Sequence, residues 1–489
     1  MRKCAAVVLM TPLEQIGTTL VALAEAAVFI RAILRPHREP ASRIAWAVVI
    51  VALPIVGVLA YLLFGEVRIS LKRRVRGREI EAKLPRPSSD GELAEKIGDG
   101  FYRAPFALAS SINGLPPTSG NRVRLAADSN IAIDEMVADI DAATSTVHLC
   151  AYIWLSDTNG CKIKDALIRA AKRGVAVRAL ADALGSRLFV RSQHWRELRD
   201  QGVEVRVALP VGNPLWTFIR GRVDLRNHRK SLIVDNRIAW IGSQNFADPE
   251  FRIKPRYAPW VDVMIRWKGP VARHCQYLFV SDWIGDGGDD ISPMLAEPWG
   301  ETDGRDASAV AQVIGTGPTV SYDSMPSCFA ELMHSAREEL VVTTPYFVPN
   351  DQVLFALTSA ARRGVDVILA LPKRNDSIVV AGTSRSYYQD LVGAGVRLFE
   401  YRCGLLHAKT MVVDRKVGLI GSANLDRRSF ELNFENNILF ADEAFAAVLR
   451  ARQEEYLADS DEVTQAVVDG FGLIGRLWQN SLAMMSPIL

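Results

Sequence analysis

Two long apolar stretches dominate residues 1–65. The run at 44–64 carries no charged side chain and is interrupted only by one proline and one glycine. About 20 such residues cross the hydrocarbon core of a bilayer, so we predict a transmembrane helix here. The shorter stretch at 16–30 contains Glu25, whose burial at mid-membrane costs about 2.5 to 3.5 kcal/mol on insertion scales. We predict that it is a second span forming a helical hairpin with the first; an interfacial helix and a cleaved signal are the alternatives.

Beyond a basic and proline-rich connector at 66–122, apolar strands alternate with amphipathic helices. The string at 170–177 combines the end of a helix, a glycine stop and an apolar strand, and 360–367 repeats this order. Alternating strands and helices are typical of α/β layers in which helices cover a sheet. We therefore predict an α/β fold with two similar domains, at 123–305 and 306–489, packed as an internal pseudo-dimer.

Charge is informative locally rather than over the whole chain. The net charge of +3 is nearly neutral and gives no reason to expect a nucleic-acid partner. A basic cluster directly follows the run at 44–64, and such a cluster attracts anionic lipid head groups at roughly 1 kcal/mol per residue. An ordinary solvated linker is the alternative interpretation. The cluster consists of Arg68, Lys72, Arg73, Arg74, Arg76 and Arg78.

The same charges predict an orientation. In a two-span hairpin, eight basic residues (Arg2, Lys3 and the cluster) lie on one side of the membrane, and the four between 31 and 43 lie on the other. Because basic residues near spans favour the cytoplasmic side, we predict a multi-pass protein whose large carboxyl-terminal body is cytoplasmic.

One unusual pattern, H-x-K-x-x-x-x-D, occurs twice, and each copy is followed by a Gly-Ser-x-Asn turn. From histidine to glycine is 14 residues both times, and from histidine to asparagine 17 both times. Two copies in register imply one shared site. The repeated positions are His228, Lys230, Asp235, Ser243 and Asn245 in the first copy and His407, Lys409, Asp414, Ser422 and Asn424 in the second.

Strand alternation gives the pattern a physical meaning. Residues two apart point to the same side of a strand, so histidine and lysine share a face in each copy. The aspartate, at an odd offset of seven, faces the other way and is expected to be a structural anchor. Polar residues between two apolar runs then predict a β-hairpin that returns the Gly-Ser-x-Asn turn to the histidine. Ammonium, amide and hydroxyl donors gathered beside a histidine describe a phosphate site.

These motifs resemble the phospholipase D superfamily, and within it the bacterial cardiolipin synthases that carry both copies in one chain. The resemblance covers nearly the whole chain, including the strings LRNHRK at 225–230, GSQNFADP at 242–249 and DRRSFELNFEN at 426–436, and the apolar amino-terminal region ending in YLLFG at 61–65. It implies two phospholipase D-like α/β domains and a location in the bacterial inner membrane.

The resemblance also implies residue roles. The family's catalytic motif covers both sets of histidine, lysine and aspartate, with His228 as the nucleophile and His407 as the acid and base. The lysines, asparagines and, in support, the serines would bind the phosphate. An attacking imidazole needs a carboxylate behind it, and the family positions for these are Asp262 and Glu435, 34 and 28 residues after the histidine of their own copy.

Three functions follow from this site. The first is transfer of a phosphatidyl group between two phosphatidylglycerol molecules, giving cardiolipin and glycerol. The second is hydrolysis, by a membrane-anchored phospholipase D or a nuclease, and the membrane anchor disfavours the nuclease. The third, a membrane-bound interaction protein with a dead site, is disfavoured because every motif residue is intact. No H-E-x-x-H string, cysteine cluster or dense carboxylate group is present, so we expect no metal and no cofactor. A homo-oligomer is left open.

Two further apolar segments lie outside the repeats. Residues 210–222 contain a tryptophan, a phenylalanine and an isoleucine in a polar setting, either as a lipid-facing lip of the site or as core packing. The tail from Gly470 has the pattern of an amphipathic helix, docked either on the core or on the membrane.

Overall fold

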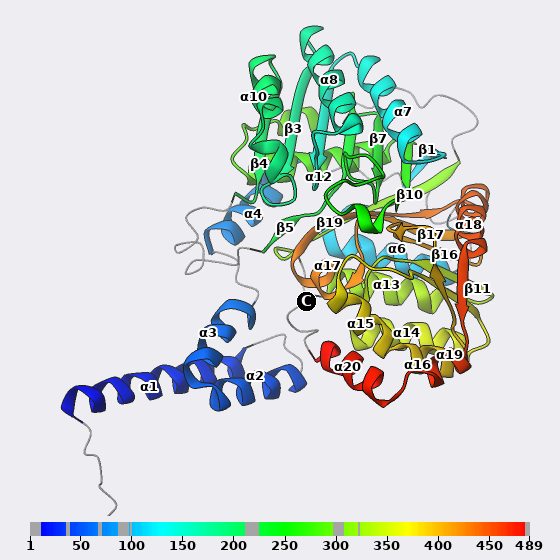
Figure 1. The fold of residues 1–489 in the computed structure, drawn as a ribbon. Coiled ribbons are helices and arrows are strands. Elements are labelled where there is room, and N and C mark those ends of the chain that lie inside the picture. Colours follow the sequence, from blue (N-terminus) through cyan, green and yellow to red (C-terminus); the bar gives the residue numbers. More distant parts are fainter. Residues whose placement is uncertain are drawn as a thin grey trace, which may run out of the picture.

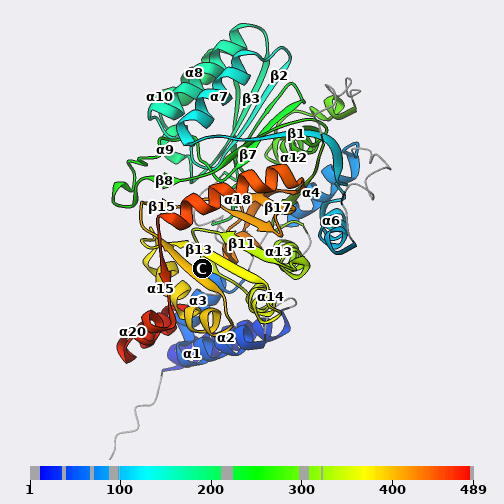
Figure 2. The ribbon, with the colours of Figure 1, turned by 90° about the vertical axis from the view of Figure 1, so that its right-hand side faces the viewer.

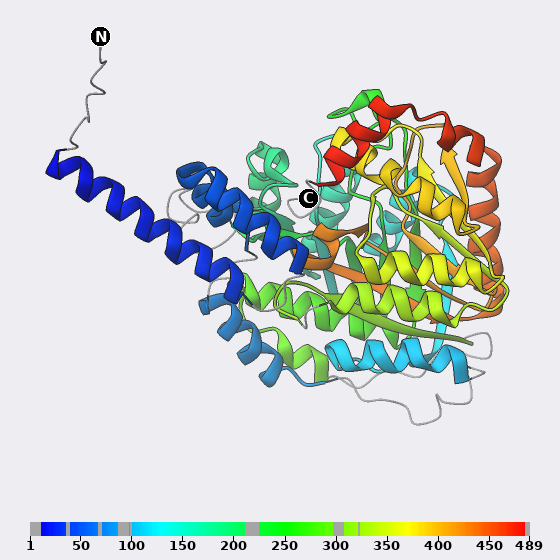
Figure 3. The same cartoon turned by 90° about the horizontal axis from the view of Figure 1, so that it is seen from below.

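A computed structural model gives the arrangement of the chain (Figure 1). It describes residues 11–35, 40–66, 71–86, 97, 100–210, 224–296, 308–320 and 323–484. Two α/β halves lie one above the other in Figure 1, and the amino-terminal helices project from the body, as the view from below shows (Figure 3). The predicted lip at 210–222 falls, apart from Pro210, outside the described residues.

Most strands of both halves join in one 16-stranded sheet, and four two-residue strands form two separate two-stranded sheets. The first half contains β1 (Thr118–Leu125), β2 (Thr146–Ala151), β3 (Ala176–Asp182), β4 (Glu204–Ala208), β5 (Arg226–Asn227), β6 (Ser231–Val234), β7 (Ile238–Gly242), β8 (Trp260–Val261) and β9 (Met264–Lys268). The second contains β10 (Ala309–Thr316), β11 (Glu339–Thr343), β12 (Phe347–Val348), β13 (Asp366–Pro372), β14 (Arg397–Tyr401), β15 (Leu405–Leu406), β16 (Thr410–Val413), β17 (Val417–Gly421), β18 (Leu425–Asp426), β19 (Asn433–Ala441) and β20 (Ser460–Val463).

The two halves have the same strand order. The first half runs β1-β9-β7-β6-β2-β3-β4 and the second β10-β19-β17-β16-β11-β13-β14, with β20 added at its edge. Antiparallel pairing of β1 with β10 joins the two sheets. The predicted α/β fold with two similar halves is therefore confirmed. The halves also share a core, because Trp267 of β9 contacts the ring of Phe440 on β19 and both are fully buried.

Helices cover the faces of this sheet. In the first half they are α7 (Ser129–Asp141), α8 (Thr158–Lys172), α9 (Arg187–Val190), α10 (Gln193–Asp200) and α12 (Val271–Gly285). In the second half they are α13 (Ser324–Ser335), α14 (Asp351–Arg362), α15 (Ile378–Ser386), α16 (Tyr388–Gly393), α17 (Arg427–Glu431), α18 (Glu443–Ala458), α19 (Gln465–Asp469) and α20 (Leu473–Ala483). The long α18 follows β19 as α12 follows β9, and it crosses the middle of the molecule in Figure 2.

The two predicted hairpins are present. Strands β6 and β7 pair from Val234 with Ile238 onward, and β16 and β17 pair from Val413 with Val417 onward. Each turn places two residues at positive φ, Asp235 (51°) and Asn236 (55°) in the first hairpin. Two consecutive residues at positive φ match the twist of the strands, and Asp and Asn tolerate this conformation better than most other residues do.

The connector at 66–122 contains more structure than its composition suggests. Helix α4 (Leu71–Lys83) packs on α12, where Arg76 donates a hydrogen bond to the carbonyl of Ile284. Helix α6 (Gly100–Asn113) packs on α13 and β10 of the second half. The first half then begins with β1 at Thr118, before the predicted boundary at 123. Part of the basic cluster is thus anchored to the protein, with Arg73 paired to Asp286, while Arg68 lies outside the described residues.

The amino-terminal region differs from the predicted hairpin. The stretch with Glu25 lies in α1 (Pro12–Leu34), 23 residues and roughly 34 Å long, which suffices to cross a bilayer. The run at 44–64 is broken into α2 (Pro40–Ala52) and α3 (Pro54–Phe64), each well short of 30 Å. Pro54 starts a new helix because its ring cannot continue the preceding one.

Contacts among α1, α2 and α3 explain the break. A Cβ on Gly57 of α3 would lie 2.2 Å from the carbonyl oxygen of Val49 in α2, so only glycine allows the two helices to approach this closely. The chain therefore bends back. Buried Glu66, after α3, accepts hydrogen bonds from Arg31 and Arg35 at the end of α1, both at 2.7 Å. In a hairpin of two spans these ends would lie on opposite sides of the membrane.

Candidate active site at the junction of the halves

The two copies of the motif meet where the halves join. His228 follows β5, which pairs with the start of β19, and His407 follows β15, which pairs with β8. The backbone N–H of His228 donates to the carbonyl of Phe434 (2.9 Å), and that of His407 donates to the carbonyl of Val261 (2.8 Å). Each histidine is thus fixed against the opposite half, and the prediction of one shared site is confirmed.

The carboxylates behind the histidines are exchanged between the halves. Nδ1 of His228 lies 2.8 Å from Oε2 of Glu435, and Nδ1 of His407 lies 2.6 Å from Oδ1 of Asp262. The pairing predicted from chain offsets, each carboxylate with the histidine of its own copy, is therefore wrong. The cause is the strand pairing, because Phe434 and Val261, which receive the histidine N–H groups, directly precede these carboxylates.

The two serines support the carboxylates. Ser243 Oγ donates to Asp262 Oδ1 and Ser422 Oγ donates to Glu435 Oε2, both at 2.5 Å, and both serines are fully buried. The backbone N–H groups of Val263 and Asn436 donate to the serine oxygens. Both hydroxyls thus donate to the carboxylates, and the expected support of phosphate binding by these serines stays a prediction.

Burial favours the neutral form of both histidines. Burial lowers the pKa of His228 and of His407 to about 4, and the nearby lysines act in the same direction. Burial alone would raise the pKa of Glu435 and of Asp262, but the histidine, lysine and serine beside each hold it below its usual value. An ionised carboxylate accepts a hydrogen bond from Nδ1–H, so the Nε2 lone pair of each ring is directed away from it.

Two buried ammonium groups complete the electrostatics. Lys230 is 0% exposed and donates to the carbonyl of His228, and Lys409 is 3% exposed and donates to that of His407, both at 2.7 Å. Burial lowers the pKa of Lys230 to about 8 and that of Lys409 to about 7. A buried cation without full compensation favours a bound anion, so this pair fits a phosphodiester.

The asparagines lie in the same buried region. Asn245 and Asn424 are 4% and 3% exposed, and within the described part of the chain their side-chain oxygens have no hydrogen-bond partner. The Nδ2 group of Asn424 makes a long contact of 3.4 Å with Asp426, whose pKa burial raises to about 6. Buried amides with unfilled hydrogen-bonding capacity are suited to a polar ligand.

The motif aspartates lie at the hairpin turns, away from the histidines. Asp235 accepts the backbone N–H groups of Thr144, Ser145 and Thr146 at 2.7 to 2.9 Å. Asp414 accepts those of Arg337, Glu338 and Glu339, and the hydroxyl of Tyr102. The anchoring role expected from the odd offset is therefore seen, and the inclusion of Asp235 and Asp414 among the catalytic residues is corrected: they hold the turn to the next strand.

Aromatic residues that lie beside the histidines were not predicted from the sequence. The ring of Tyr152 contacts His228 edge-on at 4.5 Å between centroids and lies under the Lys230 ammonium at 4.8 Å. Trp260 lies at 4.6 Å from His407, and Tyr346 approaches the same histidine at 6.4 Å. The available signal was a tyrosine just after an apolar strand in both halves, after Ala151 and near Thr343.

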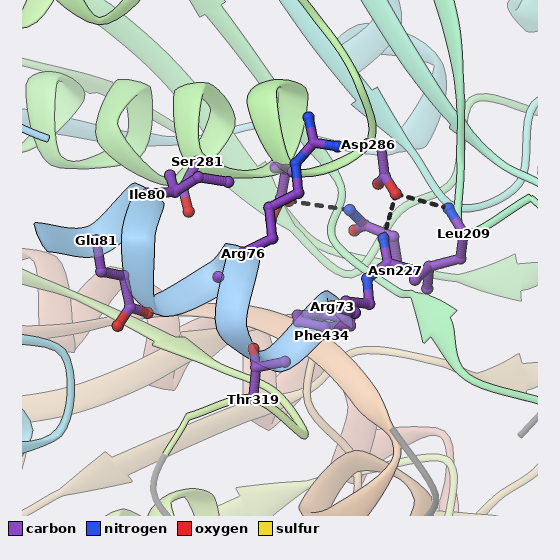
Figure 4. A pocket seen from close by; sticks show the side chains of 13 residues that line it. Arg73, Arg76, Ile80, Glu81, Leu209, Asn227, Ser281, Asp286, Thr319 and Phe434 are labelled. Atoms are coloured by element: carbon purple, nitrogen blue, oxygen red, sulfur yellow. Dashed lines mark hydrogen bonds and ion pairs between the residues drawn. The ribbon is translucent and has the colours of Figure 1, made fainter. Parts of the chain in front are cut away.

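A pocket of about 60 Å³ adjoins the strand that carries His228 (Figure 4). It lies between α4 and α12 and is lined by Arg73, Arg76, Asn227 and Phe434. Asn227 and Arg229, on either side of the histidine, both donate to Asp282 of α12. The pocket thus borders the structure that supports His228 rather than the space between the two histidines.

Comparisons with known proteins agree with this geometry. A family model described as "Cardiolipin synthase, PLD-like domain" matches residues 136–283 and 329–457. A second model, described as the phospholipase D-nuclease N-terminal region, matches residues 26–66. Together these matches cover most of both halves and the chain from the last part of α1 through α3.

Curated relatives match along most of the chain. Cardiolipin synthase A of Edwardsiella ictaluri is 35% identical over 471 residues, which cover 94% of this chain and 95% of that protein. Cardiolipin synthase A of Escherichia fergusonii is 35% identical over 469 residues with the same coverage. Among solved structures, phosphatidylserine synthase from Haemophilus influenzae matches with a TM-score of 0.56 and 14% identity, covering 79% of this chain and 100% of that chain. At that identity the likeness shows the fold alone.

Proposed function

The chain belongs to the cardiolipin synthase family of phospholipase D-like proteins, and we propose that it joins two phosphatidylglycerol molecules into cardiolipin and glycerol. It is a phosphatidyltransferase. The observation that carries the proposed chemistry is the pair of crosswise histidine–carboxylate contacts beside two buried lysines. This arrangement supplies a nucleophile, an acid and fixed positive charge without further groups.

In the first step, Nε2 of His228 attacks the phosphorus of the donor lipid. A P–N bond forms, and the bond between phosphorus and the glycerol oxygen breaks. Glu435 keeps its hydrogen bond to Nδ1–H and stabilises the positive charge that the ring gains. His407 in its protonated form gives its Nε2 proton to the departing glycerol oxygen, so glycerol leaves as a neutral alcohol.

Substrate binding favours the protonation of His407 by a proton taken up from solvent. Burial favours the neutral form of both imidazoles and lowers the pKa of both neighbouring lysines. A bound phosphodiester adds one negative charge, and this charge raises the proton affinity of the nearby rings. His407, already hydrogen-bonded to Asp262 through Nδ1, then holds the added proton on Nε2.

In the second step, the terminal hydroxyl of another phosphatidylglycerol takes the place of glycerol. Neutral His407 accepts the hydroxyl proton as the oxygen attacks phosphorus, and the P–N bond to His228 breaks. Cardiolipin forms and both histidines return to their starting states. The phosphorus–oxygen bond to glycerol is replaced by one to the second phosphatidylglycerol, and no water is consumed. Lys230 and Lys409 neutralise the phosphate oxygens throughout.

Hydrolysis is the alternative, because water can replace the lipid hydroxyl in the second step. Transfer is favoured by a membrane location, which supplies a second phosphatidylglycerol at high local concentration. The test is purified full-length protein with glycerol-labelled and phosphate-labelled phosphatidylglycerol in vesicles, with products separated by lipid chromatography. Equal amounts of cardiolipin and free glycerol support the proposal; phosphatidic acid as the main product would assign the protein to the hydrolases.

We further propose that α1 alone crosses the bacterial inner membrane and that α2 and α3 bend back to the side they entered from. The ion pairs of Glu66 with Arg31 and Arg35 support this topology. All ten basic residues from Arg31 at the end of α1 to Arg78 then lie on one side, against Arg2 and Lys3 on the other. The positive-inside rule assigns the body to the cytoplasm by a wider margin than a two-span hairpin would.

A further inference from the structure

The exposed face of α20 is more apolar than its buried face. Leu473 and Ile474 are 84% exposed, and Leu477 and Trp478 are 67% and 58% exposed. We call these four residues the tail patch. They recur one, four and five positions apart, so they lie on one side of the helix. A helix that only packs on a protein core shows the reverse pattern, with its apolar side covered.

The inward face of α20 is held to the second half by few apolar groups. Gly475 and Gln479 are half-buried, and Leu482 is the one fully covered large side chain of the helix. Leu482 packs against α15, where a Cβ on Gly382 would lie 2.3 Å from its Cδ1 atom. The helix is therefore fixed in place by α15 while the tail patch points outward.

The position of α20 connects the tail patch to the active site. Helix α15 begins at Ile378, which is 70% exposed, just after Asp376. Asp376 accepts the hydroxyl of Tyr346, the residue beside His407, at 2.7 Å and pairs with Lys254 at 2.6 Å. The tail patch and Ile378 thus belong to the side of the molecule on which His407 is supported.

Charge and surroundings indicate what covers the tail patch. From residue 470 onward the chain has no acidic residue, and its one basic residue is the exposed Arg476. Figures 1 and 2 both show α20 on the same side of the body as α1, α2 and α3, whose exposed side chains are also apolar. An exposed aromatic and aliphatic face with one basic residue and no acidic residue fits the boundary between head groups and acyl chains of an anionic bilayer.

We propose that α20 lies flat on the bilayer surface, inserts the tail patch between the lipid head groups, and so holds the His407 side of the active site against the membrane. The occupant of the tail patch is the lipid bilayer itself. This docking is separate from anchoring by α1, because α1 tethers the chain whereas α20 sets the orientation of the body. It does not depend on whether the second step is transfer or hydrolysis.

The direct test is photo-crosslinking of the full-length protein in phosphatidylglycerol vesicles that contain a lipid with a diazirine on its acyl chain. Peptide mass spectrometry maps the adducts. We expect adducts within 473–478 as well as within α1, which is the internal positive control. Adducts in α1 with none in α20 would overturn the proposal, and so would protein–protein crosslinks that join α20 to a second copy of the chain.

A second measurement uses the double variant Leu473→Glu with Leu477→Glu. On vesicles, turnover should fall several-fold, because two exposed leucines that would insert into the bilayer are replaced by charges that the bilayer repels. On short-chain phosphatidylglycerol dispersed as monomers, turnover should match the wild type. Leu188→Glu is the matched control, since Leu188 of α9 is a 57% exposed leucine of the first half. Equal loss on both substrates would contradict a membrane role, whereas a wild type that makes only phosphatidic acid would affect the proposed function alone.

Discussion

Each catalytic imidazole depends on a carboxylate from the other half of the chain. Glu435 holds His228 and Asp262 holds His407, and a buried serine fixes each carboxylate in turn. Such a chain of hydrogen bonds determines which nitrogen carries the proton and how the ring is oriented. The site therefore requires both halves in their correct relative position, and neither histidine is oriented within its own half.

Because each carboxylate orients the histidine of the other half, a carboxylate variant should resemble loss of that histidine. Glu435→Gln should behave like loss of the nucleophile, because it disturbs His228, and Asp262→Asn should behave like loss of the acid and base, because it disturbs His407. Each should lower turnover by roughly 10² to 10⁴-fold, as a wrong imidazole tautomer does elsewhere. Rapid-quench measurement of the covalent adduct separates them: Asp262→Asn should still form it, and Glu435→Gln should form it slowly. If each carboxylate instead oriented the histidine of its own copy, Glu435→Gln would still form the adduct and Asp262→Asn would form it slowly.

The buried lysines predict a pH-dependent affinity for anions. An anion binds the protonated amines, and burial lowers the pKa of Lys409 to about 7 and that of Lys230 to about 8. As pH rises through this range the amines lose their protons, so sulfate binding should weaken, by roughly tenfold per pH unit for each deprotonated lysine. Calorimetry in buffers of different ionisation enthalpy should show proton uptake on binding. Affinity that stays constant from pH 6.5 to 9 would exclude lysines with lowered pKa values.

At the scale of elements, the repeated hairpins could be predicted almost completely. The apolar runs, the polar turn and the odd offset of the aspartate were enough to place β6 with β7 and β16 with β17. The cross-half pairs β5 with β19 and β8 with β15 could not be predicted, because two-residue strands have no periodicity to detect. Those short strands decide which carboxylate reaches which histidine. The predicted pairing of each carboxylate with the histidine of its own copy was therefore wrong.

Stability should depend on the hairpin aspartates although chemistry does not. Asp414 is buried and accepts three backbone N–H groups and the Tyr102 hydroxyl. Asp414→Asn should lower the free energy of unfolding by about 2 to 4 kcal/mol, because an amide has one neutral acceptor oxygen where the carboxylate has two charged ones. Tyr102→Phe removes one of these bonds and should cost only about 1 kcal/mol. Thermal unfolding measures both. Activity per folded molecule should persist; its selective loss would return Asp414 to the catalytic residues.

The amino-terminal helices show where composition alone misleads. A run of uncharged residues at 44–64 predicted a span by length, but Pro54 and the close approach at Gly57 divide it into two short helices. The less apolar stretch with Glu25 forms the longest helix instead. Tertiary contacts that involve Glu66, Arg31 and Tyr61 select this arrangement, and hydropathy contains no information about them.

For the whole molecule, the topology can be tested with two native cysteines. With α1 as the one crossing and the body in the cytoplasm, Cys4 precedes the span and faces outward, while exposed Cys403 of the body faces inward. A membrane-impermeant maleimide applied to intact cells should modify Cys4 and spare Cys403, and permeabilisation should add Cys403. Peptide mass spectrometry identifies the sites. If Cys4 reacts only after permeabilisation, together with Cys403, the two-span hairpin is restored.

Trapping of the covalent intermediate shows whether a phosphatidyl group passes through His228. His407→Ala keeps the nucleophile but lacks the group that protonates glycerol and later activates the acceptor, so a labelled phosphatidyl adduct should build up slowly on His228. His228→Ala is the matched control and should form none. The phosphoramidate bond is stable in base, so peptides can be mapped at high pH. Label on His407 in the His228→Ala protein, or full turnover without either histidine, would contradict the account.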